Sequence, residues 1–285
     1  MKTLMGVFFF FFLSQSYGQL VIDGRNKDGA DPGAKVIDTK KKTIPVKELK
    51  VLFVGDNYSE YNSLPQVVQY IGAQLKKPVQ IQIGKLTAAN LKFSHHLTNP
   101  ATAETLKKYK WDFVVFQDHA NQPLDDPDAT KRDGASLIKM AIENGARPVI
   151  FMTWANKLEL DRTKDIFTVY KDLCLEHKVL MAPVGTAWLR ANKAYPKLQF
   201  YQENSNAPAA HGSYLAAAVI TAAITRQAVL NQKHTGLKSV SSVEGKALQK
   251  IATKTVIDYG NYIKKALADS NKTKSDTPKD KAPAK

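Results

Sequence analysis

The fold is decided by residues 51–65, which read Val-Leu-Phe-Val-Gly-Asp-Asn-Tyr-Ser-Glu-Tyr-Asn-Ser-Leu-Pro. The apolar run before Gly55 is too short for a helix, so Lys50–Val54 is predicted to be a buried strand. Polar residues follow the glycine directly. Pro65 then predicts the first turn of a helix over 64–75, because proline is well suited to that position.

Strand-like and helix-like segments alternate along the rest of the chain. Further strands are predicted at 79–83, 113–116, 148–153 and 179–184, and helices at 101–108, 133–144, 166–177, 213–232 and 243–267. This alternation predicts an α/β fold, a three-layer α/β/α sandwich with a mostly parallel sheet. Because ligands bind at the carboxyl ends of such strands, residues 56–59, 117–121 and 153–156 are expected along one rim.

Four stretches of the chain resemble the sequence blocks of the SGNH (GDSL-type) hydrolases, close to their bacterial secreted branch. Residues 51–65 are similar to a first block Gly-Asn-Ser-Tyr/Phe-Thr followed by Tyr-Asn-x-Leu/Met-Pro. Trp111–Pro123 resembles the block Trp-Asp-x-Val-Val-Leu-Gln-x-x-Ser, and Val149–Trp154 and Ala182–Trp188 resemble later stretches. The resemblance covers roughly residues 48–230. It implies a flavodoxin-like α/β fold and a serine–histidine–aspartate hydrolase site.

The resemblance breaks at the positions that carry the family's chemistry. Asn57 stands at the nucleophile position. In the last block, Asp-x-x-His-Pro-Ser-x-x-Gly-x-Tyr-Leu, anchoring on Gly212 places Asn204 at the aspartate position and Ala207 at the histidine position. An amide is not a nucleophile at neutral pH, and an alanine cannot act as a base. The sequence therefore predicts impaired ester hydrolysis, as in a pseudoenzyme.

Other side chains offer an alternative site. His119, on the loop after the predicted strand at 113–116, is expected near Asp56, and an Asp–His pair can activate water. His211 is a second candidate, although a helix-capping or surface role suits its position. The alternative prediction is an active hydrolase of esters or acylated glycans that uses His119 or His211 with Asp56.

Neutral amide side chains are frequent along the predicted rim. They suit hydroxyl-rich ligands, and the rim aromatics either offer a stacking face or simply pack there. The predicted ligand-binding residues are Asp56, Asn57, Tyr58, Gln117, Asn121, Trp154 and Asn206. The oxyanion-stabilising donors are left open between Gly84, Gln117 and Asn121, and Ser59 is expected to be a structural hydroxyl that closes the turn. A small polar ligand or glycan is the expected partner.

Three further features have structural interpretations. Cys174, the only cysteine, lies on the inward face of a predicted helix and is expected to be a buried small hydrophobe. The adjacent His95 and His96 are a poor metal pair and are interpreted as loop residues. The acidic segment 125–128 is interpreted as a solvated turn. No cofactor or metal is expected, because the sequence has no zinc-type Cys/His spacing and no glycine-rich phosphate loop.

The ends of the chain are predicted to lie outside the fold. Residues 1–18 combine a basic start, a short apolar run and small residues, which is typical of a secretory signal peptide, with a retained anchor as the alternative. Residues 19–46 are a polar leader, residues 47–267 the hydrolase-like domain, and residues 268–285 a disordered lysine-rich tail. The expected location is secreted or periplasmic, with no transmembrane segment in the mature chain.

The chain is strongly basic, with a formal net charge of +15. Part of the excess is local, because Lys264 to Lys285 carries seven lysines against three aspartates. Nucleic-acid binding is not expected, since no recognised module or basic motif interleaved with aromatics accompanies the charge. Weak attraction to anionic envelope surfaces is the interpretation that remains beside a simple solvated surface. A basic interaction protein acting through its tail is the third hypothesis for function.

Overall fold

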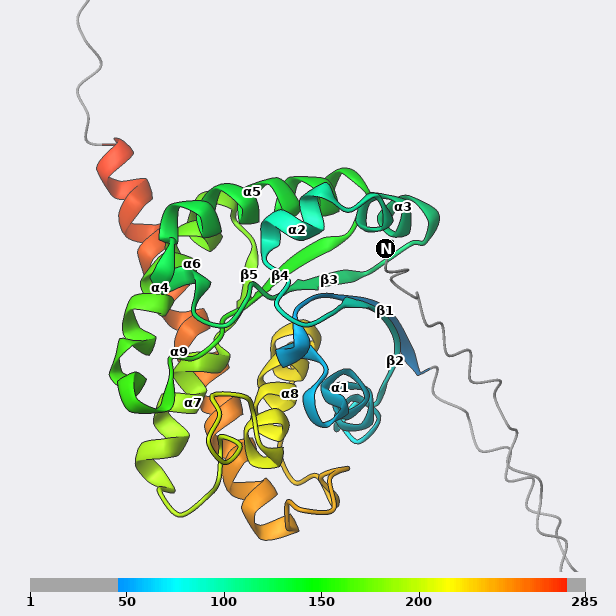
Figure 1. The fold of residues 1–285 in the computed structure, drawn as a ribbon, viewed down its shortest axis with the longest axis vertical. Coiled ribbons are helices and arrows are strands. Elements are labelled where there is room, and N and C mark those ends of the chain that lie inside the picture. Colours follow the sequence, from blue (N-terminus) through cyan, green and yellow to red (C-terminus); the bar gives the residue numbers. More distant parts are fainter. Residues whose placement is uncertain (1–45, 276–285) are drawn as a thin grey trace, which may run out of the picture.

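The computed structural model describes residues 46–275 (Figure 1). The predicted signal peptide, the leader up to residue 45 and the last ten residues of the predicted tail lie outside the described residues. Figure 1 shows a central sheet with helices on both faces. Its five strands are all parallel and run in the order β2-β1-β3-β4-β5. The predicted α/β/α sandwich is therefore confirmed.

Strands and helices alternate along the chain, with two α-helices after β2 and after β3 and three after β5. The strands are β1 (Lys47–Gly55), β2 (Val79–Thr87), β3 (Phe113–Phe116), β4 (Arg147–Phe151) and β5 (Leu180–Ala182). The helices are α1 (Leu64–Ala73), α2 (Phe93–Thr98), α3 (Pro100–Lys108), α4 (Gln122–Asp125), α5 (Pro127–Glu143), α6 (Thr163–His177), α7 (Val184–Ala194), α8 (Ala210–Thr225) and α9 (Ser242–Ser275). Short 3-10 turns at η1 (Asn57–Ser59), η2 (Tyr61–Ser63) and η3 (Lys157–Arg162) complete the order.

The strand β1 is buried on both faces, which is why its sequence is a continuous apolar run rather than an alternating one. Val51 and Phe53 belong to the hydrophobic cluster that includes α1, α7 and α8. Leu52 and Val54 point the other way, into the cluster formed with α2, α5 and α6. The run that predicted the strand thus also joins the two layers of helices.

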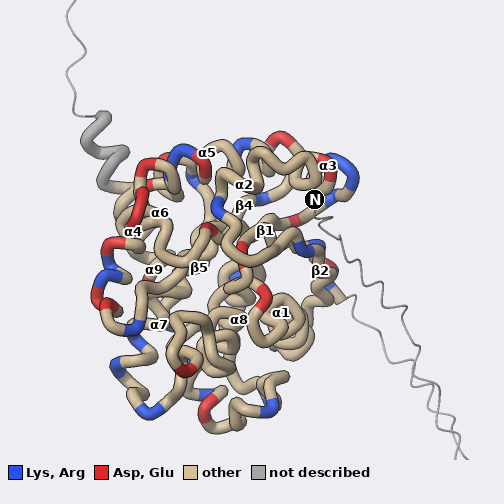
Figure 2. The backbone as a smooth tube through the Cα atoms, in the orientation of Figure 1, with Lys and Arg blue, Asp and Glu red and all other residues tan. Residues whose placement is uncertain are grey.

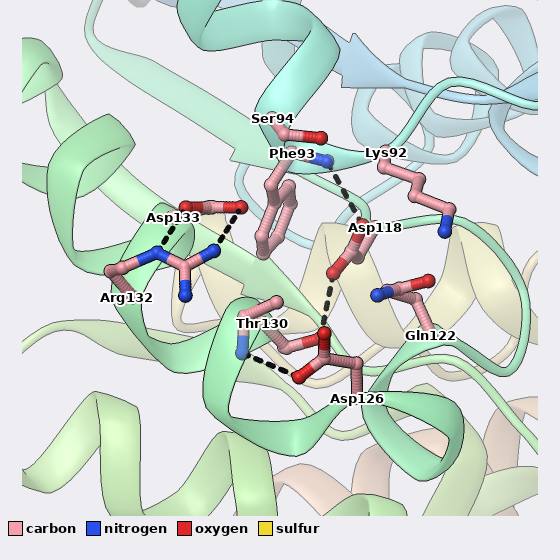
Figure 3. Close-up of a pocket in the computed structure, with 10 residues that line it drawn as sticks. Lys92, Phe93, Ser94, Asp118, Gln122, Asp126, Thr130, Arg132 and Asp133 are labelled. Carbon is pink, nitrogen blue, oxygen red and sulfur yellow. Dashed lines mark hydrogen bonds and ion pairs between the residues drawn. The ribbon is translucent and has the colours of Figure 1, made fainter.

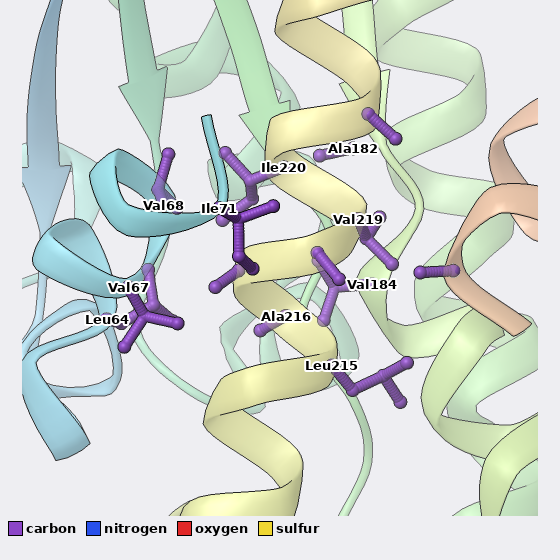
Figure 4. Close-up of a cluster of buried hydrophobic side chains, with 14 of the residues drawn as sticks. Leu64, Val67, Val68, Ile71, Ala182, Val184, Leu215, Ala216, Val219 and Ile220 are labelled. Carbon is purple, nitrogen blue, oxygen red and sulfur yellow. The ribbon is translucent and has the colours of Figure 1, made fainter. Parts of the chain in front are cut away.

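The helix α8 is apolar all round because it is enclosed on every side. It packs against α1, α7 and α9, and its alanines allow close approach. Figure 4 shows α1 and α8 facing each other through Val67, Ile71, Ala216 and Ile220. Burying such side chains supplies the main driving force for folding, roughly 1.5–3 kcal/mol for each large aliphatic group.

Several predicted boundaries are corrected by the structure. The helix predicted at 213–232 ends at Thr225, where Arg226 adopts a left-handed conformation with φ of 55°. Beyond it the chain forms a loop in which Val229 is buried, and the backbone N–H of Val229 donates to Thr253 Oγ1 of α9 (3.1 Å). Helix α9 continues to Ser275, past the predicted end at 267. The first error arises because local periodicity does not distinguish a loop with a buried apolar residue from a helix. The second arises because alanine and lysine are strong helix formers and extend α9 beyond its apolar face.

Three helices were not predicted: α2, α4 and α7. The acidic segment 125–128, interpreted as a solvated turn, instead ends α4 and begins α5. The region of His95 and His96, interpreted as a loop, forms α2. The strand predicted at 179–184 is shorter, and Val184 instead begins α7. The prediction on Cys174 is confirmed, since the thiol is buried. Gly145, which follows α5, has a φ of 78°. Burial raises the pKa of the Cys174 thiol, so it stays protonated and inert.

Charged residues are distributed over the outside of the molecule. Figure 2 shows Lys and Arg interspersed with Asp and Glu on helices such as α5 and α6, whereas α1 and α8 carry none of these residues. Several of these form surface ion pairs, such as Lys254 Nζ with Asp258 Oδ1 (3.1 Å).

In the part of the chain that the structure describes, no helix is both long and apolar enough to cross a membrane.

Candidate functional site

The candidate site lies at the carboxyl ends of β1 and β3. From β1 the chain crosses to β2 on one side, whereas β3 lies on the other side of β1. Loops leaving the two strands therefore diverge, and such a switch point is where open parallel sheets bind ligands. Asp56 follows β1 and Gln117 follows β3, as the rim prediction required.

Gln117 pins the turn that leaves β1. Its side-chain oxygen accepts hydrogen bonds from the backbone N–H of Asp56 (3.1 Å) and from the Ser59 hydroxyl (2.9 Å). Gly55 is required here, because a Cβ at this position would come within 2.9 Å of the same Gln117 oxygen. Ser59 is thus the structural hydroxyl that was predicted. Gln117 itself is fully buried, so it serves the turn rather than a ligand.

Asp56 and His119 form a hydrogen-bonded pair. His119 Nδ1 lies 2.9 Å from Asp56 Oδ2, and the backbone N–H of His119 donates to Asp118 Oδ1 (2.9 Å). The other Asp56 oxygen accepts from the backbone N–H of Tyr58 (2.7 Å). Burial raises the pKa of Asp56, and the hydrogen bonds from Tyr58, Gln117 and His119 oppose that rise. The structure thus brings together the pair that the sequence predicted, with the carboxylate orienting the imidazole as in a hydrolytic triad.

Asn57, predicted to stand at the nucleophile position, makes no hydrogen bond to an imidazole within the described residues. Its amide nitrogen lies 3.4 Å from the Tyr61 hydroxyl, a weak hydrogen bond, and its side chain is half-buried. Within the described residues no hydroxyl is hydrogen-bonded to the His119 ring. The Asp–His pair therefore lacks the third member that would turn it into a nucleophilic site.

The last-block segment forms a tight turn over the end of the sheet. Backbone hydrogen bonds join Gln202 N to Ala207 O (2.9 Å), and Asn204 at the tip has a φ of 53°, a conformation that asparagine tolerates. Ala207 is 5% exposed and packs into the hydrophobic cluster of α1 and α8. Ala207, predicted to stand at the family's histidine position, is therefore part of the core.

The carbonyl of Asn206 fastens this turn to two aromatic rings. It accepts hydrogen bonds from the Tyr58 hydroxyl (3.0 Å) and from Trp154 Nε1 (3.4 Å). The Asn206 side-chain oxygen accepts from the backbone N–H of Lys157 (2.9 Å). The backbone oxygen and the side-chain oxygen of Asn206 thus both have internal partners.

Trp154 does not offer a free stacking face. It is 1% exposed and stacks on Tyr58 with ring centroids 5.1 Å apart and on Trp188 at 3.6 Å. Of the two roles left open for the rim aromatics, packing is the one that this geometry supports. The predicted ligand contacts at Tyr58 and Trp154 are corrected accordingly, because a sugar ring could reach them only by displacing the stack.

His211 is separated from the Asp56–His119 pair. It lies in the first turn of α8, where its Nε2 is 3.5 Å from Glu244 Oε2 of α9. Within the described residues it makes no hydrogen bond or ion pair with Asp56 or His119.

Two of the residues considered as oxyanion donors lie in different places. Asn121 precedes α4 and is half-buried, and its carbonyl accepts from Leu124 N (2.7 Å). Gly84 lies inside β2, paired with Leu52 and covered by Trp111, so it is not at the rim.

Sequence reasoning missed the role of His96. Its Nε2 lies 3.2 Å from the Gly55 carbonyl, which can only accept, so this nitrogen carries the hydrogen. Nδ1 is buried without a partner. Burial lowers the pKa of His96 to about 4, with the Gly55 contact opposing. Neutral His96 thus supports the turn that presents Asp56. The sequence analysis interpreted this region as a loop, so it did not predict that α2 would direct His96 towards Gly55.

We expect acid to destabilise the protein partly through His96. Unfolded His96 has its ordinary pKa of 6.5 and the native group about 4, so the unfolded state binds the extra proton between these values. The stability contributed by neutral His96 is present above pH 6.5 and is lost as the pH falls towards 4. Between pH 7 and pH 5 the native protein should lose about 2 kcal/mol more than a His96→Gln variant.

Urea unfolding of both proteins at the two pH values measures this difference. The buried Asp56 and Asp118 carboxyls have raised pKa values and act in the opposite direction, so only the comparison with the variant isolates His96. Equal pH dependence in the two proteins would contradict the assignment.

Comparison with solved structures places this fold among the SGNH hydrolases. A protein from Slackia heliotrinireducens, described as a candidate SGNH hydrolase, is 23% identical, with a TM-score of 0.54, covering 62% of this chain and 100% of that chain. A DUF4886 family protein from Bacteroides uniformis is 17% identical, with a TM-score of 0.65, covering 74% and 95%. A catalytic mutant of an acetylxylan esterase from Geobacillus stearothermophilus is 13% identical, with a TM-score of 0.50, covering 62% and 94%.

These similarities establish the fold, and the chain has the α/β architecture of an SGNH hydrolase. No protein-family model matches the sequence, and no curated protein matches it. The similarity therefore lies in the three-dimensional arrangement of the sheet and its helices.

Proposed function

We propose that this chain is an exported SGNH-like protein with impaired ester hydrolysis, which binds a small polar ligand beside the Asp56–His119 pair. One observation carries the proposal: the position after Asp56 holds an amide, and His119 meets a carboxylate but no hydroxyl. Loss of a triad member typically lowers turnover by several orders of magnitude. Ala207, enclosed in the core, offers no replacement base.

The exposed polar groups define the ligand that suits the site. The His119 side chain is 30% exposed and Asn57 is half-buried, so both can offer hydrogen bonds to a bound hydroxyl or acyl group. Asn121 lies on the same β3 loop as His119. Since one structure with this fold is of an acetylxylan esterase, we propose an acylated or hydroxyl-rich glycan as the ligand class.

The second candidate function is hydrolysis without a serine. The 2.9 Å contact with Asp56 orients His119 as a general base, which could activate a water against an acetyl ester. This reaction needs no covalent intermediate. It differs from the first proposal in one measurable respect, turnover that depends on His119.

Turnover of a short-chain nitrophenyl ester and of an acetylated xylooligosaccharide decides between them. Under the first proposal the native protein shows no more turnover than His119→Ala, and a fluorophosphonate probe does not label it. His119→Ala and Asn57→Ala should still weaken binding of the acetylated xylooligosaccharide, whereas His234→Ala, in an exposed loop, should not. Turnover abolished by His119→Ala alone would replace the first proposal by the second.

Export is proposed from residues 1–18 and the basic tail is proposed to add weak attraction to anionic envelope surfaces. Residues 1–18 lie outside the described residues, and the tail extends beyond them after Ser275. Mass spectrometry of the protein recovered outside the cytoplasm should show a mature chain that begins at Gln19. A chain retaining its first residues would contradict the signal-peptide interpretation.

A further inference from the structure

A polar pocket lies between the loop before α2 and the start of α5. It has a volume of about 220 Å³ and is lined by residues that include Lys92, Phe93, Asp118, Gln122 and Asp126. Figure 3 shows these side chains converging from the two loops, with Gln122 between Lys92 and Asp126. The volume is below the range of drug-sized sites, so a correspondingly small molecule would fit.

Gln122 is the unexplained group in this pocket. The residue is only 6% exposed, and within the described chain its side-chain amide has no hydrogen-bond partner. Its nitrogen and oxygen are not among the side-chain atoms that are buried without a partner, so both atoms are open to the pocket. Its backbone N–H, in contrast, is satisfied by His119 O (2.7 Å). The side chain thus holds one donor group and one acceptor towards the pocket that no protein group uses.

Two opposite charges flank this amide. The Lys92 ammonium makes no ion pair in the described residues. Asp126 uses one carboxylate oxygen to accept from Ala129 N (2.9 Å) at the start of α5 and has the other free. Figure 3 places Lys92 and Asp126 on either side of Gln122.

The remaining charged groups of the pocket are already satisfied. Asp118 accepts hydrogen bonds from Phe93 N, His119 N and the Thr130 hydroxyl, each at 2.9 Å. Arg132 Nε pairs with Asp133 at 3.0 Å. What is left for a ligand is therefore one cation, one anion and the amide between them.

We propose that this pocket binds a small zwitterion of the α-amino-acid class. The carboxylate of the ligand lies against Lys92 and the amide nitrogen of Gln122, and its ammonium group lies against Asp126 and the amide oxygen. Charge-assisted hydrogen bonds of this kind are stronger than neutral ones, so both ends of the ligand contribute. The proposal is independent of the Asp56–His119 pair, because neither residue lines the pocket.

Binding of L-alanine to the full chain tests the proposal, followed by calorimetry and by saturation transfer to its methyl group. The native protein should show saturable binding, and Gln122→Met and Lys92→Met should each weaken it by roughly tenfold or more. Lys139→Met is the matched control, since Lys139 is an exposed lysine on α5. Acetate and ethylammonium, which each carry one charge, should both bind at least roughly tenfold more weakly than L-alanine.

Three results would overturn the assignment: no saturable binding of L-alanine, binding that both variants leave unchanged, or acetate binding as tightly as L-alanine. Lys92 is only partly buried, at the N-cap of α2, so Lys92→Met tests the pocket even if Gln122→Met does not fold. His119→Ala should leave L-alanine binding intact, so failure of this proposal and failure of the rim proposal are distinguishable.

Discussion

Replacing Trp154 with alanine is expected to lower the free energy of unfolding by about 4 kcal/mol, because a fully buried tryptophan is lost and a cavity is left behind. The indole is stacked between Tyr58 and Trp188 and also contacts Phe151. The indole N–H also donates to the carbonyl of Asn206, so Trp154→Ala removes one of the hydrogen bonds that hold the turn over the end of the sheet. A loss of this size is a large part of the stability of a typical domain.

Urea unfolding of Trp154→Ala beside Leu158→Ala measures this effect. Leu158 is 96% exposed on the same β4–α6 connection, so its truncation should change the stability by less than about 0.5 kcal/mol. Trp154→Phe keeps a ring in the stack and should lose clearly less than the alanine variant, which covers the case in which Trp154→Ala does not fold. Equal stability of Trp154→Ala and Leu158→Ala would show that the stack is not a stabilising element.

Gly185→Ala is expected to cost about 3 kcal/mol, although alanine is the better helix former. Gly185 lies in the first turn of α7, where a Cβ would come within 2.0 Å of the Thr153 carbonyl oxygen and 2.9 Å of Met152 Cε. The first of these is a backbone atom, so α7 must move away from the end of β4. Its N–H also donates to the Met152 carbonyl (3.0 Å), and that bond would stretch.

Gly260→Ala is the matched control, with the opposite sign. Gly260 is inside α9 and has nothing within 4 Å of an added Cβ, so the same substitution should stabilise the protein by about 0.5–1 kcal/mol. Thermal and urea unfolding of the two variants should move in opposite directions. If both variants were stabilised, helix propensity rather than the contact with Thr153 would decide the stability of Gly185→Ala.

The strand–turn stretch at 51–65 contained enough information to predict much of the site. A buried run followed by Gly-Asp places Asp56 at the rim whatever the rest of the chain does, because the direction of the strand determines where its end lies. The second rim segment, after the strand at 113–116, follows by the same logic. Parallel strands end at one edge, and so the contact between His119 and Asp56 could be expected before the structure was seen.

The use of each rim residue could not be predicted in the same way. Gln117, Trp154 and Asn206 have side chains typical of a binding site, yet their partners are internal. Those partners come from distant segments: Gln117 and Asp56 are 61 residues apart in the sequence, and Asn206 and Tyr58 are 148 residues apart. A polar or aromatic residue at the end of a strand is available to a ligand only if no distant segment reaches it first.

The sequence by itself determined the parallel α/β sheet, the placing of Asp56 and His119 at its rim, and the absence of a serine at position 57, because these depend on local apolar runs and on residue identity. Only the tertiary structure decided that Ala207 belongs to the core, that His96 supports the Gly55 turn, and that Gln122 faces a pocket with an unused amide. The physical reason is that burial and hydrogen-bond satisfaction are properties of packed neighbours far apart in the chain, and no local pattern records them.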